Sequence, residues 1–247
     1  MKSPVSLRFG HRAVPLDEGA FRAVEVVAAR IPPILAPPEA ILRRRLARPV
    51  ASPRLRELLK KGDTVGIPIS DVTRYSATEL FLPHLLEETD AAGIPRRHVT
   101  LFVARGTHRA LTNTELAEAV GPEIESGIRV EQSDPEGDTK PLGTTSRGTP
   151  VKVCRSLMER DKIVLTGTIS FHYFAGFGGG RKALVPGCAA RETAMATHFR
   201  IFRTDGPGKH PMARPGVLAR NPVHEDIVEA VSLAPPVFLL NTLLAPD

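Results

Sequence analysis

The segment from His172 to Lys182 reads HYFAGFGGGRK, and His198 follows it sixteen residues later. It brings an imidazole, a run of glycines and a lysine amine into one short stretch, with a second imidazole close behind. Glycines let backbone N–H groups approach an anion closely. A deprotonated lysine can bond covalently to a ligand, and neutral histidine is a common metal ligand. These residue types indicate a site for an anionic or metal-containing group.

The glycine run does not fit the two common nucleotide-binding loops. A Walker loop needs glycine directly before the lysine and Ser or Thr directly after it, whereas Lys182 lies between Arg181 and Ala183. The spacing over Gly176 to Gly180 is G-x-G-x-G, and the HYFA sequence before it is not the end of an apolar strand. Neither a P-loop nor a dinucleotide fingerprint is therefore expected.

Composition indicates an ordinary soluble globular protein. The chain has 247 residues, of which 42% are hydrophobic and 24% are charged. No apolar run is long enough to span a bilayer, and the first residues lead into no signal-peptide core. We therefore expect a cytoplasmic protein without a membrane partner.

The chain carries a basic net charge that permits binding of nucleic acid or of small anionic ligands. The net charge is +6 and the isoelectric point is about 9.7. The basic clusters at Arg43 to Arg45 and at Arg96 and Arg97 are isolated, and tryptophan is absent, so the usual stacking platforms for bases are missing. A basic surface that attracts small anionic substrates explains the charge equally well, and no nucleic-acid partner is expected.

The two cysteines, Cys154 and Cys188, are far apart in sequence and form no C-x-x-C motif. A disulfide framework or a structural zinc site therefore has no support. We expect both to act as small buried hydrophobic residues.

The chain is predicted to fold as one α/β domain with two parts. Residues 1–53 are expected to form a wrapping segment, with an opening strand at Val5, Leu7 and Phe9 that turns at Gly10 and His11, and a helix over 38–47. Residues 54–247 are expected to form the main sheet. Strands are predicted there over 64–69, 98–104, 128–131, 151–154, 162–169 and 237–244, and helices over 77–88, 112–121, 189–199 and 221–231. The stretch between 131 and 151 is interpreted as a loop.

This alternation predicts a mainly parallel, Rossmann-like sheet with helices on both faces. Ligands of such sheets bind beyond the carboxyl ends of the strands. Asp71 and Arg74, His108 and His172 each follow a predicted strand end. Three separate loops are therefore expected to aim polar side chains at one rim.

Each of these residues also has a plainer interpretation. A loop histidine such as His108 is often a solvated residue, Asp71 and Arg74 can form a local ion pair, and Lys182 alone resembles a surface lysine. His198, in the middle of a predicted helix, resembles a core or surface histidine. The aromatic neighbours of His172 are expected to exclude water and shift its pKa. Five other histidines show no comparable setting and are assigned nothing: His11, His84, His98, His210 and His224.

Taken together, the motifs DVTR at 71–74, GTHR at 106–109 and HYFAGFGGGRK at 172–182, with His198, resemble the nickel-pincer lactate racemase family. The motifs occur in that family's order, and the likeness covers nearly the whole chain. It implies that residues 1–247 form an amino-terminal cofactor-binding domain. It also implies a carboxyl-terminal domain that is missing from this chain, which is then a fragment or a natural split.

The resemblance also implies the cofactor and its ligands. A nickel ion is held in a pyridinium dithio-acid mononucleotide that is bound covalently to Lys182, and His198 completes the nickel coordination. His108 and His172 act as acid and base on opposite faces of a small 2-hydroxy acid. Cofactor maturation and nickel-insertion proteins are implied as partners, with a separate carboxyl-terminal domain as a further one. Asp71 and Arg74 contact cofactor or substrate, and the glycines expected to cradle the phosphate, with help from Arg181, are Gly176, Gly178, Gly179 and Gly180.

Physical chemistry agrees with an isomerase that racemises or epimerises 2-hydroxy carboxylic acids. The α C–H of such an acid is a poor acid, because its deprotonation places a second negative charge beside the carboxylate. Removal of hydride avoids that dianion and gives a planar keto acid, to which hydride can return on either face. One base is then needed for each enantiomer, which accounts for two histidines. Sulfur donors with an imidazole suit nickel.

One departure from the family pattern and two other functions remain open. Tyr75 follows Arg74 where the family commonly has proline, which bears on substrate preference. A zinc-dependent hydrolase is the second enzyme hypothesis, although the chain lacks an H-E-x-x-H or comparable signature. A truncated module that binds cofactor or partner without turnover is the non-enzyme alternative.

Overall fold

The computed structural model describes residues 5–10, 12–27, 36–121, 123, 127–234 and 236–244. The chain divides into two compact units, 1–34 with 246–247 and 35–245. In the first unit, β1 (Ser6–Phe9) pairs antiparallel with β2 (Arg12–Pro15), and a 3-10 turn, η1 (Glu18–Ala20), follows. The predicted opening strand is confirmed, whereas His11 of its turn lies outside the described residues. A wrapping role for residues 1–53 stays a prediction.

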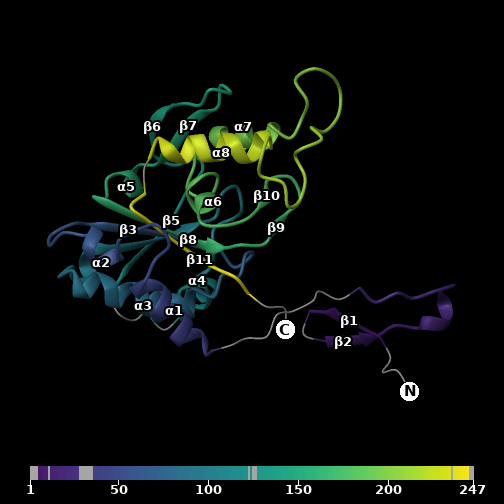
Figure 1. The fold of residues 1–247 in the computed structure, drawn as a ribbon, viewed down its shortest axis with the longest axis horizontal. Helices are drawn as coiled ribbons and strands as arrows, with labels where there is room; N and C mark the ends of the chain where they lie inside the picture. The colour runs from purple at the N-terminus through teal and green to yellow at the C-terminus, as the bar shows by residue number, and fades with distance from the viewer. Residues whose placement is uncertain are drawn as a thin grey trace. The chain divides into compact units, whose positions relative to one another are not determined.

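The second unit is built on a five-stranded parallel sheet (Figure 1). The strands lie in the order β11-β8-β3-β4-β5, so the α/β class with a parallel sheet is confirmed. Their bounds follow the predicted strands to within a few residues. They are β3 (Val65–Ser70), β4 (Val99–Ala104), β5 (Arg129–Gln132), β8 (Lys162–Thr168) and β11 (Phe238–Thr242).

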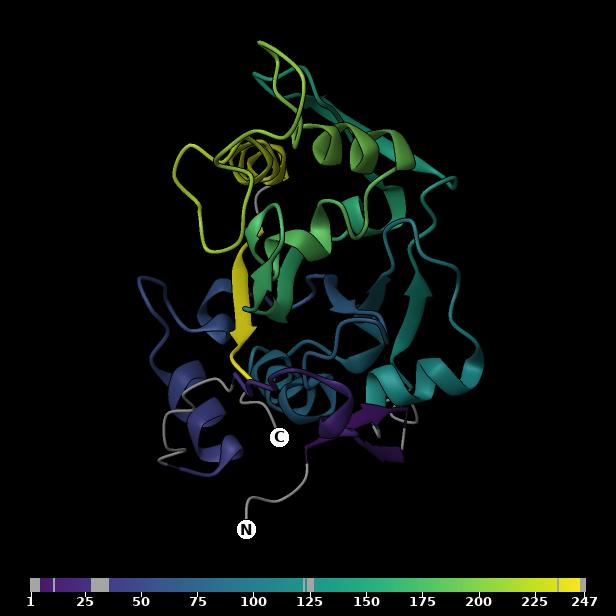
Figure 2. The ribbon, with the colours of Figure 1, turned by 90° about the vertical axis from the view of Figure 1, so that its right-hand side faces the viewer.

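Helices cover both faces of this sheet, as Figures 1 and 2 show. Ile67 and Leu101 face one apolar cluster, which α1 (Pro38–Ala47), α2 (Leu55–Leu58), α3 (Thr78–Ala91) and α4 (Asn113–Val120) cover. Phe102 and Leu165 face the other, which α5 (Arg155–Met158), α6 (Arg181–Leu184) and α8 (Pro222–Ser232) cover, with α7 (Arg191–Phe199) beside α8. A short 3-10 turn, η2 (Arg96–His98), precedes β4. Within the described ranges, no helix has both the length and the apolar character needed to cross a membrane.

Local signals set several of the helix bounds. The predicted capping box is present, since the Thr112 N–H donates to the Glu115 carboxylate at 2.8 Å and the Glu115 N–H donates to the Thr112 hydroxyl at 3.3 Å. Asn221 caps α8 by accepting the N–H groups of Val223 and His224 at 3.1 and 3.2 Å. Both predicted helix starts are therefore confirmed.

The stretch between β5 and β8 differs from the prediction. The predicted strand at 151–154 is present as β7 (Pro150–Cys154), but it pairs antiparallel with β6 (Thr139–Thr144) in a hairpin outside the main sheet. The interpretation of 132–150 as a loop was therefore wrong in part. The side chains of β6 are exposed or half-buried, so its sequence, TKPLGT, carries no apolar alternation to mark it as a strand.

Candidate active site

A crevice opens where β3 and β8 separate. The two strands are paired only near their starts, Val65 with Lys162 and Gly66 with Ile163. Pro68 in the middle of β3 has no N–H to donate to a ladder, and the Thr166 hydroxyl of β8 donates to its carbonyl at 2.7 Å instead. The chain also leaves this point in opposite directions across the sheet. From β3 it continues to β4 on one side, and from β8 it continues to β11 on the other. Such a switch point is the usual ligand crevice of a parallel sheet.

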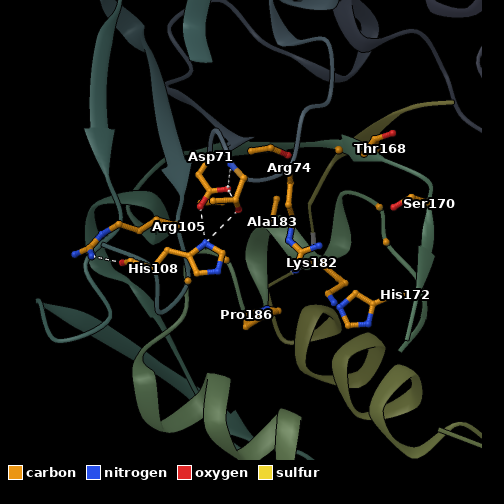
Figure 3. Close-up of a pocket in the computed structure, with 18 of the residues that line it drawn as sticks. Asp71, Arg74, Arg105, His108, Thr168, Ser170, His172, Lys182, Ala183 and Pro186 are labelled. Carbon is orange, nitrogen blue, oxygen red and sulfur yellow. Dashed lines mark hydrogen bonds and ion pairs between the residues drawn. The ribbon is translucent and has the colours of Figure 1, made fainter. Parts of the chain in front are cut away.

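A pocket of about 380 Å³ occupies this crevice, beyond the carboxyl ends of β3, β4 and β8 (Figure 3). In the view of Figure 3, Asp71 and His108 lie on one side, His172 on the other, and Arg74 and Lys182 between them. Eight of the ten residues singled out from the sequence line the pocket: Asp71, Arg74, His108, His172, Gly178, Gly179, Lys182 and His198. The other two, Gly176 and Gly180, are not part of its lining.

Asp71 pairs with His108 across the loops that follow β3 and β4. The Nδ1 atom of His108 lies 2.6 Å from Oδ2 of Asp71, whose residue is 5% exposed. The other carboxylate oxygen accepts the Thr73 hydroxyl at 2.7 Å and the Thr73 N–H at 3.1 Å. Because Nδ1–H donates to the carboxylate, Nε2 of a neutral His108 is a proton acceptor. The suggested local ion pair of Asp71 with Arg74 was therefore wrong.

Two residues that the sequence analysis did not single out hold this pair in place. Thr73 lies beside it, with its hydroxyl 3.4 Å from Nδ1 of His108. Arg105 fixes the loop, since its guanidinium donates to the carbonyls of Ser133 and His108 at 2.5 and 2.7 Å and to the Asp134 carboxylate at 2.9 Å. Arg105 directly follows β4, as Asp71 follows β3. Its position after a strand end was therefore the sequence signal that could have identified it.

His172 lies in a dry part of the pocket. Its residue is 5% exposed, and its ring lies 4.5 Å from that of Phe174 and 5.0 Å from that of Tyr173. Burial, helped by the positive charges of Lys182 and Arg74, lowers the pKa of His172 to about 3. The Ala175 N–H donates to Nδ1 at 3.2 Å, so the neutral ring carries its proton on Nε2. His172 is therefore a neutral hydrogen-bond donor.

Lys182 reaches the pocket from α6. Burial is the main cause that lowers the pKa of this amine to about 7, and the charges of Arg74 and Arg181 add to it. Its Nζ lies 5.7 Å from the centre of the Phe174 ring. The Lys182 amine is therefore partly neutral near pH 7, and a neutral amine is a nucleophile.

His198 lies on α7 with one ring nitrogen fixed. Nδ1 lies 2.5 Å from the carbonyl of Ala194, one helical turn earlier, so Nδ1–H donates to that carbonyl and Nε2 keeps its lone pair. Burial lowers the pKa of His198, with Lys182 and Arg74 adding to the effect. Metal-binding histidines commonly have this arrangement, a neutral ring oriented by a backbone carbonyl.

The glycine run serves packing as well as the pocket. A Cβ on Gly176 would lie 2.2 Å from the Val217 carbonyl oxygen, and one on Gly180 would lie 2.4 Å from Leu239. Both positions therefore need glycine for close approach to neighbouring chain. Arg181 donates to the carbonyls of Gly178 and Phe177 at 2.8 and 3.0 Å. Its terminal nitrogens hydrogen-bond to the glycine run, and Arg181 is not part of the pocket lining. This corrects the expectation that Arg181 helps to bind phosphate.

Sequence comparisons identify relatives over most of the chain. The family described as the lactate racemase N-terminal domain matches residues 9–208. A lactate racemase of Thermoanaerobacterium thermosaccharolyticum is 32% identical over 208 residues, which are 83% of this chain and 47% of that protein. A lactate racemase of Lactiplantibacillus plantarum is 31% identical over 83% of this chain and 48% of its own length.

Solved structures give the same relationship. The lactate racemase apoprotein from Thermoanaerobacterium thermosaccharolyticum superposes with a TM-score of 0.80 and 27% identity, over 98% of this chain and 56% of that one. A Thermotoga maritima protein, 22% identical with a TM-score of 0.63 over 85% of this chain and 52% of its own, shares the fold. The chain spans about half the length of these relatives. It belongs to the lactate racemase N-terminal domain family.

Proposed function

We propose that the pocket holds a nickel-containing mononucleotide and that the protein serves the racemisation or epimerisation of 2-hydroxy carboxylic acids. The observation that carries the proposal is the gathering of Lys182, His198, His172 and the Asp71–His108 pair around one pocket. These groups come from four separate segments of a chain whose relatives are lactate racemases. The geometry therefore supports the family's chemistry at named residues.

The residues present fit the implied cofactor. The cavity of about 380 Å³ has the size of a small-molecule site. Lys182 offers an amine that is partly neutral at pH 7, and His198 offers Nε2 as a ligand. Among the residues that the structure describes, no group of three or more His, Cys, Asp or Glu could hold a metal ion. A metal at His198 would then take its other ligands from an organic group, which suits a sulfur-rich nickel cofactor better than a zinc site built from protein ligands.

Protein side chains would handle the substrate and its protons. When bound, the cofactor would supply an acceptor for the hydrogen on the substrate's α carbon. Nε2 of His108 would accept the hydroxyl proton of one enantiomer, because Asp71 holds Nδ1–H and stabilises the positive ring that results. His172 would serve the other face through Nε2, which requires the ring to change tautomer, because its Nδ1 accepts the Ala175 N–H and its proton lies on Nε2. Arg74, which lines the pocket between them, would pair with the substrate carboxylate.

Loading of the pocket would also prepare His172 for this task. The charges of Lys182 and Arg74 help to keep its pKa low. A covalent bond at the Lys182 amine removes the first of these charges, and a substrate carboxylate offsets the second. Both changes raise the pKa of His172, while its burial, the main cause of the low value, remains. Uptake of a proton also requires Nδ1 to release the Ala175 N–H.

Co-production with the maturation and nickel-insertion proteins tests the proposal. Intact mass spectrometry should find a covalent adduct on the chain that Lys182→Ala lacks and that Lys140→Ala, an exposed control, retains. His198→Ala should keep the adduct and lose most of the bound nickel, while His210→Ala, outside the pocket lining, keeps both. An adduct that survives Lys182→Ala, or a nickel content unchanged in His198→Ala, would contradict the assignment.

Turnover separates the enzyme from a binding module. Closed, water-excluded sites favour hydride transfer, and this chain spans about half of its racemase relatives. We therefore expect the loaded chain to racemise lactate slowly alone and faster when the carboxyl-terminal half of a lactate racemase is added in trans, as measured by chiral chromatography. A loaded chain that stays inactive with that half present would favour the binding module.

A further inference from the structure

We propose that Cys154 and Cys188 are a redox pair that forms a reversible disulfide across two adjacent segments of the folded chain. They are the two cysteines of the sequence, and both are free thiols in the structure. The proposal is independent of the racemase function.

The register of the chain places the two cysteines opposite each other. Val153 of β7 forms an antiparallel bridge with Ala189, so the next position along β7, Cys154, faces Cys188. The Cys154 N–H donates to the Cys188 carbonyl at 2.9 Å, which confirms this register. Opposed residues of an antiparallel pair have side chains on the same face, with Cβ atoms about 4.5–5.5 Å apart. A disulfide needs Cα atoms about 4.4–6.8 Å apart and Cβ atoms about 3.5–4.5 Å apart. Such a pair meets the first range, and bond formation brings the two Cβ atoms about 1 Å closer to meet the second.

Burial makes the two thiols unequal. Cys188 is 1% exposed and belongs to the apolar cluster between the sheet and α8, against which the half-buried Cys154 also packs. Burial, with the neighbouring Cys154 as a second cause, raises the pKa of the Cys188 thiol. Cys154 is therefore the thiol that meets a solution oxidant first, and Cys188 is the resolving thiol.

The exchange balances with a small disulfide, such as oxidised glutathione, as the oxidant. The Cys154 thiolate attacks one sulfur of that disulfide, forms a mixed disulfide and releases one small thiol. Cys188 loses its proton to water and attacks the Cys154 sulfur, which forms the protein disulfide and releases the second small thiol. Two protein thiols are oxidised by two electrons, and the small disulfide is reduced to two thiols. The second step is slow because Cys188 is buried.

The bond would tie down one wall of the candidate active site. Gly187, which lines the pocket, directly precedes Cys188, and its carbonyl accepts the Gly106 N–H at 2.8 Å and the Ser133 hydroxyl at 2.9 Å. The same segment joins the helix of Lys182 to the helix of His198. Oxidation would therefore fasten this connection to β7.

An equilibrium measurement tests the pair on the intact chain. The protein is brought to equilibrium in mixtures of reduced and oxidised glutathione, from the reduced and from the oxidised side, then quenched with acid and alkylated. Mass spectrometry should show loss of two hydrogen atoms and no alkylation of either cysteine in the oxidised fraction. We expect the equilibrium constant for the disulfide to be roughly 10²-fold larger for the folded chain than for the chain in urea.

Two single-cysteine variants complete the test, and two results would contradict the proposal. Cys188→Ser should stop at a mixed disulfide on Cys154, and Cys154→Ser should leave Cys188 unreacted while the protein stays folded. Folded wild-type protein that stops at the mixed disulfide would overturn the proposal. An equilibrium constant for the folded chain that is equal to or below that in urea would also overturn it, because the fold would then oppose the bond.

Discussion

The two sides of the pocket place a histidine in different environments. His108 is half-exposed, with 46% of its side chain accessible, and it shares a proton with the buried carboxylate of Asp71. His172, on the other side, is buried, receives a backbone N–H, and has a pKa lowered to about 3. One histidine lies beside a negative charge, and the other is kept neutral.

The side of the pocket that holds His172 holds two other groups with lowered pKa values. Lys182 and His198 also lie there, and burial is the main cause of the lowered pKa of each. Phe174 connects them, since its ring lies 4.5 Å from that of His172 and 5.2 Å from that of His198. A buried aromatic residue thus supports a side that is chemically suited to covalent attachment and metal binding, whereas the Asp71 side is suited to proton transfer.

The largest expected effect comes from removing either histidine. In the assembled, loaded enzyme, His108→Ala and His172→Ala should each reduce racemisation in both directions by about 10²–10⁴-fold, because each turnover uses one histidine to accept a proton and the other to donate one. Added imidazole should partly restore the rate of His108→Ala, whose site is half-exposed, and not that of His172→Ala. A near-parental rate in either variant, measured by chiral chromatography, would refute the pairing.

Much of the fold was predictable because its signals are local. The helix at 38–47 begins with a proline at its first position, and the caps at Thr112 and Asn221 act over three residues. The elements that escaped prediction have no such signal. The four-residue α6 that carries Lys182 is too short for a periodic pattern, and the polar β6 is a strand because it pairs with β7.

The site was predictable as a set of residues and not as a set of contacts. Strand ends identified Asp71, His108 and His172, since parallel strands end on one edge. The partner of Asp71 could not be predicted, because it lies 37 residues away and depends on how two loops turn toward each other. The contacts of Arg181 could not be predicted for a related reason, because only the folded structure shows that its guanidinium donates to carbonyls of its own loop.

Acid should destabilise the chain in part through His172. Below its ordinary pKa of 6.5, His172 takes up a proton in the unfolded chain but not in the folded one, whose value is about 3. Stability is therefore lost as pH falls from 6.5, by about 2–3 kcal/mol at pH 4. Urea unfolding of the wild type should show this loss relative to His172→Phe. An equal loss in His172→Phe would show that His172 is not its cause.

A smaller stability effect is expected from Lys182. Its pKa of about 7 in the folded chain lies below the ordinary 10.5, so the unfolded chain holds the extra proton between these values and stability rises with pH across them. At pH 7 the buried amine therefore destabilises the protein, with an upper bound of about 4 kcal/mol from linkage. Solvent screening of this partly exposed amine reduces the expected gain in the free energy of unfolding for Lys182→Met to about 1–2 kcal/mol. The gain should vanish near pH 10.5. Lys140→Met, on an exposed strand, is the matched control, and a gain of the same size there would show that burial of Lys182 is not the cause.

The smallest effect on stability is expected on the side of the pocket that holds Asp71 and His108. Asp71→Asn should change the free energy of unfolding by less than about 1 kcal/mol, because the His108 partner is half-exposed. The amide keeps the shape of the carboxylate and its bonds to Thr73 but cannot stabilise a positively charged His108. The rate of racemisation in the assembled enzyme should therefore fall by about 10–10²-fold, by analogy with other hydrogen-bond partners that orient a working histidine. The pH profile of the rate should also change, because the variant lacks the carboxylate that lies 2.6 Å from Nδ1 of His108. A large loss of stability with an unchanged pH profile would instead mean that Asp71 holds the loops together and does not tune His108.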